Sequence, residues 1–501
     1  MATLQLIGAG LASALSPYNL LFCFLGVLLG TAVGVLPGFG PLAAISLLLP
    51  ITFHLEPSVG LIMLAGIYYG SQYGGSITSI LLNIPGEASS AVTCLDGHPL
   101  ARQGRAGAAL FLTTFASFLG GSVGIVLIMG FSPLLAQMAL SFSSVDYFSM
   151  MLFGLIVAAT LSVGSPFKGL IMVVIGLLLA LVGTDATTGT QRFTFGLLQL
   201  EDGLNLAAIA IGLFGISEIF ASVGASNVYN VDPRSITLRS LMPTRAELSA
   251  AANSSLRGSA IGSLLGVLPG AGPALSSFVA YAAEKRLSKT PARFGRGAVE
   301  GLAAPEAANN AAAQTAFIPT LSLGIPGSAT LAVMLGALMY HNVTPGPQFI
   351  VQYPDLFWTL VMSFWVGNII LVILNIPFIG LWVRMLATPY GLLFPAMLVF
   401  ICIGAFSVSN STFDVGVALI SGIIGYGCKR YGYPGAPLLL AFILEPLMEQ
   451  NLRRALLISD GDPGVFFTRP LSASLLVAAL LLLLVSVLLA VRDSRTRRAP
   501  A

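Results

Sequence analysis

Residues 34–41 read GVLPGFGP, and residues 266–273 repeat that octapeptide with Ala271 in place of Phe39. Both copies lie inside long apolar stretches, although proline and glycine interrupt helices. In a membrane, a broken helix leaves backbone N–H and C=O groups unpaired, which costs several kcal/mol per group unless protein or a polar cavity surrounds the break. Two such breaks therefore predict a duplicated membrane protein with a polar site at membrane depth.

The composition also indicates a membrane protein. Of the 501 residues, 56% are hydrophobic and 9% are charged, whereas a typical soluble domain has about 25% charged residues. The stretches 106–142 and 471–491 contain no charged residue and are long enough to cross a bilayer, which takes about 20 residues. We predict an all-α polytopic membrane protein with roughly 11–13 membrane segments.

Two further matches extend the internal repeat. The separation between matching residues grows steadily along the chain, as small insertions in the second copy would produce. We therefore expect two homologous transmembrane repeats, at 15–225 and 250–460, joined by a polar linker at 226–249 and followed by a C-terminal helix at 471–491 with a basic tail. The matches, in chain order, are Pro37 with Pro269 (232 residues apart), 84–89 with 325–330 (241 apart) and 167–176 with 413–422 (246 apart).

Basic residues differ between equivalent loops of the two repeats. The segment 285–296, after the second octapeptide, holds five lysines and arginines, and the matching segment 51–58 holds none. Beyond the later motif the difference reverses, because 98–105 contains two arginines and 341–348 contains neither lysine nor arginine. Lysine and arginine mark the cytoplasmic side of membrane proteins. We therefore expect inverted repeats with broken helices or re-entrant hairpins, which are typical of secondary transporters.

The motifs Ile84-Pro85-Gly86 and Ile325-Pro326-Gly327 supply a second pair of breaks. A helix that starts after such a break presents free N–H groups and a positive dipole end to an anion, and freed carbonyls can coordinate a cation. Small hydroxyl residues follow both motifs and can hydrogen-bond a carboxylate without a buried positive charge. These breaks predict binding of an anion and a cation, whereas a simple helix kink is the plainer alternative.

Polar residues near the second motif allow two interpretations. The segments 66–75 and 301–316 are rich in small residues, which predicts close helix packing. Glu306, Asn309 and Asn310 lie within the second segment, and polar residues inside a membrane usually mark function. For Glu306, a position at the membrane edge is the alternative.

The sequence gives little support for catalysis. His54, His98 and His341 lack zinc-site spacing, and the ATP-binding pattern GxxxxGK[ST] does not occur. Asp96 and Asp185 are candidate proton or cation ligands, with a helix cap or turn as the alternative for Asp96. We expect no enzyme activity and no cofactor, and an intramembrane enzyme or an ion channel stays as the alternative function.

Four long motifs carry a resemblance to a known family. With them, the chain resembles the large membrane subunit (TctA type) of the tripartite tricarboxylate transporters over about residues 26–454. The motifs are GVLPGFGP from Gly34, YYGSQYGGSITSILLNIPGEASSAVTCLDGHPLARQG from Tyr68, GVLPGAGP from Gly266 and AAPEAANNAAAQTAFIPTLSLGIPGSAT from Ala303.

The resemblance implies a multi-pass protein of the bacterial inner membrane with two protein partners, a small membrane subunit and a periplasmic solute-binding protein. It implies carboxylate import, of a tricarboxylate such as citrate or of a related di- or monocarboxylate. Import would be symport with a cation, usually sodium, with alternating access and without ATP. The lipid bilayer is the remaining expected partner, and no nucleic acid is expected.

Together, the breaks and the resemblance lead to three sets of expected site residues. The substrate-binding set is Pro85, Gly86, Ser89, Ser90, Pro326, Gly327, Ser328 and Thr330. The cation-binding set is Ser71, Asn83, Asn310 and Gly324, with no metal beyond transported sodium. The hairpin bends that would close around these sites are Pro37, Gly38, Gly40, Pro269, Gly270 and Gly272.

Overall fold

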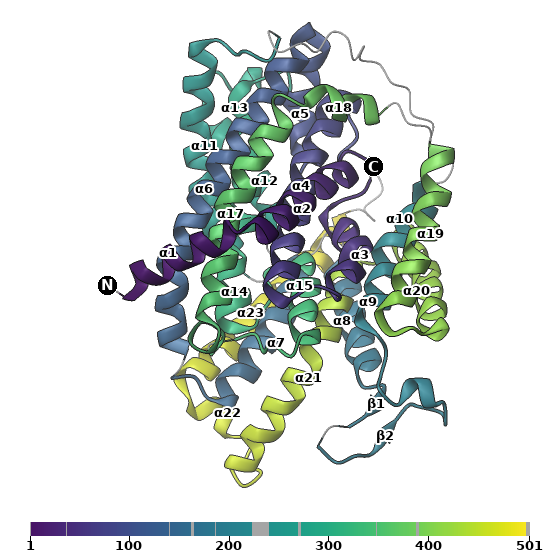
Figure 1. The fold of residues 1–501 in the computed structure, drawn as a ribbon. Helices are drawn as coiled ribbons and strands as arrows, with labels where there is room; N and C mark the ends of the chain where they lie inside the picture. The colour runs from purple at the N-terminus through teal and green to yellow at the C-terminus, as the bar shows by residue number, and fades with distance from the viewer. Residues whose placement is uncertain are drawn as a thin grey trace.

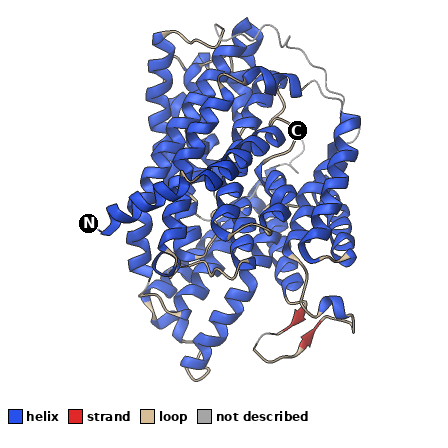
Figure 2. Cartoon of the chain, in the orientation of Figure 1, coloured by secondary structure: helices blue, strands red, loops and turns tan. Residues whose placement is uncertain are grey.

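The structure is a computed structural model that describes residues 2–36, 38–139, 141–161, 165–185, 187–222, 240–268, 272–346, 348–386 and 390–496. Helices form nearly all of this part of the chain (Figures 1 and 2). Within it, the strands are β1 (Gly183–Thr184) and β2 (Gln191–Arg192), which pair antiparallel in a small hairpin. The predicted all-α class is confirmed.

The helices of the first half of the chain are α1 (Ala2–Ala14), α2 (Pro17–Gly34), α3 (Pro41–Thr52), α4 (Pro57–Leu82), α5 (Ala91–Leu100), η1 (Ala101–Arg105), α6 (Ala106–Ala139), α7 (Ser144–Leu161), α8 (Pro166–Ala180), η2 (Leu198–Leu200), α9 (Leu206–Ala210), η3 (Ile211–Ile216) and α10 (Ser217–Ser222). Those of the second half are α11 (Arg245–Gly266), α12 (Gly272–Leu287), η5 (Pro291–Arg293), α13 (Val299–Thr315), α14 (Phe317–Leu323), α15 (Ala329–Tyr340), α16 (Phe349–Gln352), α17 (Pro354–Asn375), α18 (Ile379–Met385), α19 (Tyr390–Ser409), α20 (Thr412–Arg430), α21 (Gly435–Ile458), α22 (Val465–Thr468) and α23 (Pro470–Thr496).

Glycines bring the backbones of α2 and α4 into direct contact. Three glycines of α2, one turn apart, face successive carbonyl oxygens of α4. A Cβ on any of them would come closer to that oxygen than real Cβ contacts allow, so a side chain would force the two helices apart. The pairs are Gly26 with Met63, Gly30 with Ile67 and Gly34 with Ser71.

The same contact recurs between α11 and α13 in the second half. Each of these glycines lies 232 residues after a contact glycine of α2. Each residue that it faces lies 241 residues after the matching residue of α4. These are the separations already found for the octapeptides and the Ile-Pro-Gly motifs, which supports the predicted duplication. The pairs are Gly258 with Ala304, Gly262 with Ala308 and Gly266 with Ala312.

The octapeptides lie between paired helices. The first separates α2 from α3. Within it, Gly38 has a φ of 87°, and Gly40 directly precedes Pro41, the first residue of α3. The second separates α11 from α12, which starts at Gly272 with a φ of 56°. Pro37, Pro269 and Gly270 lie outside the described residues, as does most of the predicted linker. The end of that linker is helical, because α11 starts at Arg245.

Two buried helices form the centre of the molecule. In α4, every residue from Val59 to Leu81 is buried, and in α13 every residue from Gly301 to Thr315 is buried. α6 also packs on α13, beside α11, with Gly120 against the backbone of Ala307. The polar residues of both central helices are therefore held inside protein rather than in contact with lipid.

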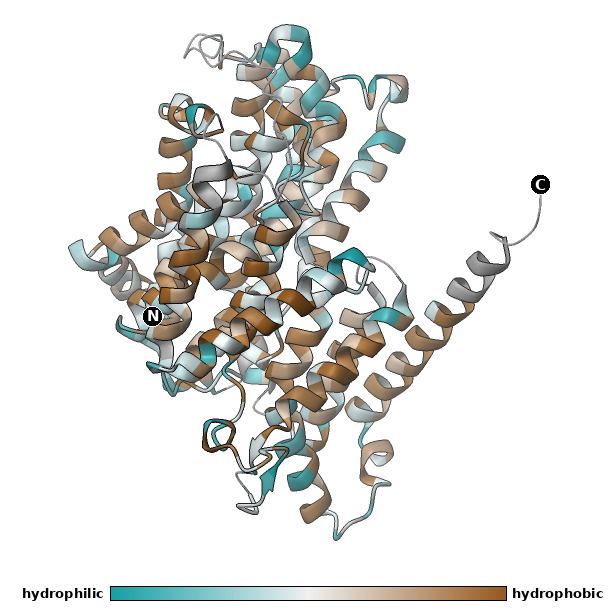
Figure 3. Ribbon diagram, turned by 90° about the vertical axis from the view of Figure 1, so that its right-hand side faces the viewer, coloured by the Kyte–Doolittle hydropathy of each residue, from teal (hydrophilic) through white to brown (hydrophobic). Residues whose placement is uncertain are grey.

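Four described helical stretches are long and apolar enough to cross a membrane, at 17–34, 91–134, 354–375 and 470–488. Several shorter apolar helices accompany them, among them α3, α8 and α15. The stretch in α23 is 11% buried, and Figure 3 shows this helix as largely apolar, at the side of the molecule, where it packs on α7. The chain is therefore a multi-pass membrane protein, and α23 contains the predicted C-terminal helix.

Candidate functional site

Each Ile-Pro-Gly motif interrupts a helix and forms a short tip. In the first half, α4 ends at Leu82, Asn83 takes a left-handed conformation with a φ of 58°, and α5 starts at Ala91. In the second half, α14 ends at Leu323, Gly324 is left-handed with a φ of 73°, and α15 starts at Ala329. We call residues 83–90 the first tip and residues 324–328 the second tip.

The glycines of both tips permit close packing. A Cβ on Gly86 would lie 2.5 Å from the Cα of Gly75 in α4, and a Cβ on Gly327 would lie 2.8 Å from the Cβ of Ala316. The Gly327 N–H donates to the Thr320 hydroxyl at 3.2 Å. Both tips are therefore fastened to the buried helices that precede them.

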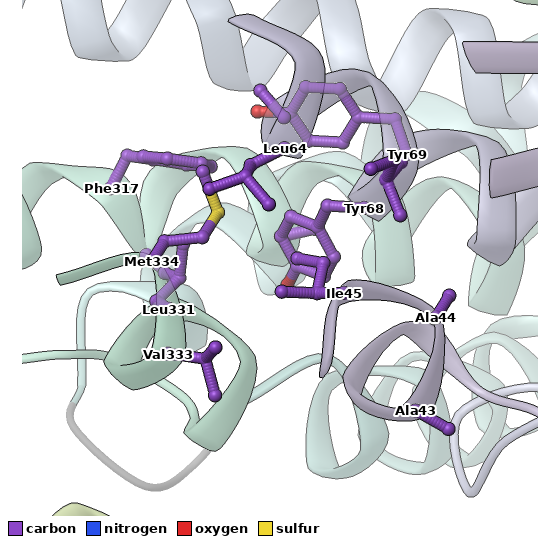
Figure 4. Packing of buried hydrophobic residues seen from close by; sticks show 14 of the residues in the cluster. Ala43, Ala44, Ile45, Leu64, Tyr68, Tyr69, Phe317, Leu331, Val333 and Met334 are labelled. Carbon is purple, nitrogen blue, oxygen red and sulfur yellow. The ribbon is translucent and has the colours of Figure 1, made fainter. Parts of the chain in front are cut away.

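The two tips meet around Tyr68 of α4. Its phenol lies within electrostatic range of Glu87 in the first tip and close to Ser328 in the second. Figure 4 shows the Tyr68 ring between Ile45 of α3 and the α15 residues Leu331 and Met334. Tyr68 is 1% exposed, and its hydroxyl has no hydrogen-bond partner among the described residues. Residues far apart in the sequence thus converge on one polar point.

Glu306 of α13 is the second centre of the site. It is 1% exposed, and the Ser76 hydroxyl of α4 donates to both of its carboxylate oxygens at 2.9 Å. The hydroxyls of Thr93 in α5 and Ser117 in α6 donate to the same carboxylate, the latter at 3.3 Å. Three helices of the first half therefore hold one acidic side chain of the second half inside the protein.

Several buried polar atoms of the two central helices have no hydrogen-bond partner in the described part of the chain. They are the Tyr68 and Ser71 hydroxyls and both amide atoms of Gln72 and Asn309. The Asn309 amide lies near the Glu87 carboxylate but in no hydrogen-bonding geometry with it. Buried polar groups are nearly always paired, and an unpaired one costs about 1–3 kcal/mol. A cluster of them indicates a place where a ligand completes the bonding.

The expected substrate residues occupy different environments. Ser89 donates to the Glu87 carboxylate, while Ser90 accepts from the Glu87 N–H at 3.1 Å and donates to its carbonyl at 3.0 Å. Ser328 caps α15 by accepting from the Leu331 N–H at 3.3 Å. Pro85 is exposed, whereas Gly86, Pro326, Gly327 and Thr330 are buried.

The expected cation-binding residues also lie in two different parts of the structure. Ser71 is buried with a free hydroxyl, and Asn310 donates to the backbone carbonyl of Glu306 at 3.1 Å. Asn83 and Gly324 sit at the left-handed ends of α4 and α14, where Asn83 is exposed and Gly324 is buried. Ser71 and Asn310 thus belong to the two central helices, and the other two residues mark the starts of the tips.

Asp96 holds a structural position. Its Oδ1 accepts the backbone N–H groups of Gly295, Gly297 and Ala298 at 2.9, 2.8 and 2.7 Å, and its Oδ2 accepts the Tyr281 hydroxyl at 3.0 Å. Because these donors precede α13, Asp96 caps a helix of the other half. Asp96 itself lies within α5, so the expected local cap or turn is wrong, and its carboxylate instead anchors the distant segment that leads into α13.

Asp185 also holds a structural position, in the hairpin. It accepts the Thr187 N–H at 2.9 Å and forms ion pairs with Arg192 and with Arg453 of α21. The Thr187 hydrogen bond, followed by the contacts with the two arginines, holds the pKa of this carboxyl well below its usual range. These bonds leave Asp185 little capacity as a cation ligand.

The stretch Gly120-Gly121-Ser122-Val123-Gly124 matches the serine-hydrolase pattern GxSxG. It lies inside α6, however, where Gly120 and Gly124 pack against α13 and Ser122 donates to the Phe118 carbonyl at 2.7 Å. The pattern therefore serves helix packing, because a catalytic serine needs an exposed strand-to-helix turn.

Sequence reasoning did not assign Glu87, Tyr68 and Gln72 to the site, and it named Asn309 without a role. One signal was available, since Glu87 occupies the position that Ser328 has in the second motif. When the two copies of a duplicated site differ in charge, each copy is a candidate for a different ligand.

Comparison with known proteins assigns the chain to a family. The model of the tripartite tricarboxylate transporter TctA family matches residues 20–440. An uncharacterized 52.8 kDa protein in the TAR-I ttuC' 3'region of Agrobacterium vitis is 49% identical over 98% of this chain and 97% of its own length. An uncharacterized protein in the TAR-II ttuC' 3'region of the same organism is 54% identical over 47% of this chain and 97% of its own length.

No solved structure matches the chain. The family match covers both octapeptides, both tips and the two central helices, so it includes every element of the site. TctA proteins are transporter subunits rather than enzymes. The protein therefore belongs to the tripartite tricarboxylate transporter TctA family.

Proposed function

We propose that this protein is the large membrane subunit of a secondary transporter that imports carboxylates, by symport with a cation that we take to be sodium. The observation that carries the proposal is the convergence of both tips on Tyr68, beside buried polar groups that have no partner among the described residues. The sites of secondary transporters form in this way, at broken helices between two repeats.

The second tip is the better place for a substrate carboxylate. Ser328 starts α15, so the free N–H groups and the positive dipole end of this 12-residue helix point toward the tip. The Tyr68 hydroxyl nearby can donate to the same anion. We keep Pro326, Gly327, Ser328 and Thr330 as substrate-binding residues, and the first-tip residues as part of the same closed site.

Transport by alternating access would use the inverted repeats. The matching contacts of α2 with α4 and of α11 with α13 favour two equivalent units, each with a broken helix beside its glycine-packed pair. Movement of one unit relative to the other would open the site to either side of the membrane. An ion channel is less favoured, because the polar side chains of the two central helices, such as Gln72, Glu306 and Asn309, are each only 1% exposed.

The distribution of basic residues suggests the orientation in the membrane. One end of the molecule gathers η1, the start of α11 and the loop before α13, through the Arg105–Glu247 ion pair and the Gln103–Arg296 hydrogen bond. The hairpin and α22 lie at the other end (Figure 1). By the positive-inside rule, the first end faces the cytoplasm. The basic residues at that end include Arg102, Arg105, Arg245, Lys285, Arg286, Lys289, Arg293 and Arg296.

In the bacterial inner membrane, the hairpin end would then face the periplasm. That is where a soluble solute-binding protein would deliver the carboxylate. The small membrane subunit would contact the lipid-facing surface, for which α23 offers a long apolar helix that is 11% buried within this chain.

Uptake into proteoliposomes tests the proposal. Vesicles would contain this chain and the small subunit, with the binding protein outside, and labelled citrate, a dicarboxylate and a monocarboxylate would be supplied in turn. We expect accumulation of at least one of them under an inward sodium gradient, and none when choline replaces sodium. Uptake that follows ATP and ignores the sodium gradient would contradict this function.

A further inference from the structure

The two tips differ by one charge at equivalent positions. Glu87 follows Gly86 in the first tip, and 241 residues later Ser328 follows Gly327 in the second. Glu87 engages the hydroxyls of its own tip. Gly86, the residue before it, packs on Gly75 of α4, and the hydroxyl of the next residue, Ser76, donates to Glu306, so the tip brings Glu87 close to Glu306. The first tip therefore contributes a carboxylate to the site, and the second contributes a hydroxyl.

Glu87 and Glu306 have no positive partner in the described residues. None of the ion pairs there joins either carboxylate to a lysine, arginine or histidine. The groups that interact with them are hydroxyls, an amide and each other. A buried acid beside a half-buried one, without a positive partner, is unfavourable in a membrane protein, so a cation should accompany the pair when both are ionised.

Unpaired ligand atoms lie beside the two acids. Asn309 is 1% exposed, lies one turn along α13 from Glu306, and has neither amide atom paired. Its amide lies near Glu87, and among the described residues its oxygen has no partner, so it is available to a cation. The hydroxyls of Ser76, Thr93 and Ser117 can rotate their lone pairs toward a cation in the same space.

The donor types favour an alkali cation. Carboxylate, amide and hydroxyl oxygens are hard ligands, which suit sodium and other hard cations better than transition metals. In the described part of the chain, no group of three or more histidine, cysteine, aspartate or glutamate residues could hold a metal ion. Two acids with neutral oxygens fit a cation of low charge that must also be released.

We propose that Glu87 and Glu306 are the carboxylate ligands of the transported sodium ion, with Asn309 and the neighbouring hydroxyls as its neutral ligands. This inference rests on the proposed cation symport. It moves the cation away from the expected ligands Asn83 and Gly324 and places it between the first tip and α13.

The arrangement couples the two ligands. Tyr68 lies near both Glu87 and Ser328, so a carboxylate bound at the second tip would lie beside the Glu87 charge. Like charges repel strongly where water is excluded. A sodium ion between Glu87 and Glu306 offsets one of their two negative charges and so weakens that repulsion, and the anion then binds with the cation in place. Substrate alone would bind weakly, which is the condition for symport without leakage.

Sodium binding to the purified chain in lipid nanodiscs tests the site without substrate. Sodium chloride replaces choline chloride at constant ionic strength, and the unfolding temperature is followed by tryptophan fluorescence. We expect a saturable rise for the wild type and its loss in Glu87→Gln and in Glu306→Gln. As a matched control, Glu218→Gln should keep the wild-type response, because Glu218 pairs with Lys429 elsewhere.

Ser117→Ala extends the test if a carboxylate variant fails to fold. It keeps both acids, and loss of one neutral ligand should raise the half-saturating sodium concentration by about tenfold. A wild-type sodium response in both Gln variants would overturn the site, as would a wild-type protein that responds to pH but not to sodium. Sodium-driven uptake by the Gln variants would remove the site and keep the transporter function. Intact sodium binding without any carboxylate uptake would keep the site and remove the transporter function.

Discussion

The Oδ1 atom of Asp96 lies 2.7 Å from the backbone nitrogen of Ala298, so α5 of the first half caps the start of α13 in the second. Two glycine N–H groups, of Gly295 and Gly297, share the same oxygen. Asp96 thereby fixes the position of the helix that carries Glu306 and Asn309. The capping contact links the edge of the molecule to its central site.

Replacement of this cap should destabilise the protein. Asp96→Ala leaves three backbone donors unpaired, and loss of a helix cap costs about 1–2 kcal/mol. We expect a lower unfolding temperature in nanodiscs and reduced uptake, because the start of α13 is loosened. Asp202→Ala, at an exposed aspartate, is the control and should leave both unchanged. An unfolding temperature equal to that of the wild type would show that the cap is dispensable.

Side chains at the glycine contacts should prevent helix packing. Gly30→Ala and Gly262→Ala each place a methyl group against a backbone carbonyl of the facing helix, which cannot move aside as a side chain can. We expect aggregation or loss of the monodisperse peak in size-exclusion chromatography. Gly416→Ala is the matched control, since nothing lies within 4 Å of its Cβ and alanine favours a helix. Normal behaviour of both contact variants would refute the close approach.

Acid should weaken the hairpin through Asp185. The pKa of Asp185 is depressed in the folded protein, mainly by the Thr187 N–H and the paired arginines, so its contribution is fully present above the unfolded value of 3.8. That contribution is lost as the pH falls below this value toward the folded pKa. We expect Asp185→Asn to lower the unfolding temperature at neutral pH and to flatten its fall in acid.

The control for this pH dependence is Asp460→Asn, at an exposed aspartate outside the hairpin. Its unfolding temperature should follow the wild-type curve from about pH 7 to about pH 3, a range that spans the ordinary carboxyl pKa values. If Asp185→Asn followed the wild-type curve as well, the ion pairs with Arg192 and Arg453 would make no contribution to acid stability.

The sequence predicts the breaks and the duplication better than it predicts the site. Proline and glycine act locally, so the ends of α4 and α14 follow from the Ile-Pro-Gly motifs themselves. The meeting of Tyr68 with Ser328, and of Glu87 with Asn309, depends on contacts between residues more than 200 positions apart. Local rules likewise suggested a cap at Asp96 but not that it would serve α13, because only the packed fold brings the two together.

Variants of two adjacent tyrosines should distinguish an effect on substrate binding from an effect on stability. Tyr68 and Tyr69 are both buried in α4, but the Tyr69 hydroxyl donates to Gln314 at 2.7 Å, whereas the Tyr68 hydroxyl has no partner among the described residues. Tyr68→Phe removes a hydroxyl that forms no hydrogen bond within the described part of the chain, so the unfolding temperature should stay the same or rise. If that hydroxyl binds the substrate carboxylate, the KM for uptake should increase about tenfold or more.

Tyr69→Phe is the matched control and should behave in the opposite way. It leaves the Gln314 amide oxygen unpaired in a buried position, which costs about 1–3 kcal/mol. The unfolding temperature should therefore fall, while the KM of the folded fraction stays close to that of the wild type. A normal KM in Tyr68→Phe would remove Tyr68 from the substrate site, and the anion would then depend on Ser328 and the α15 backbone alone.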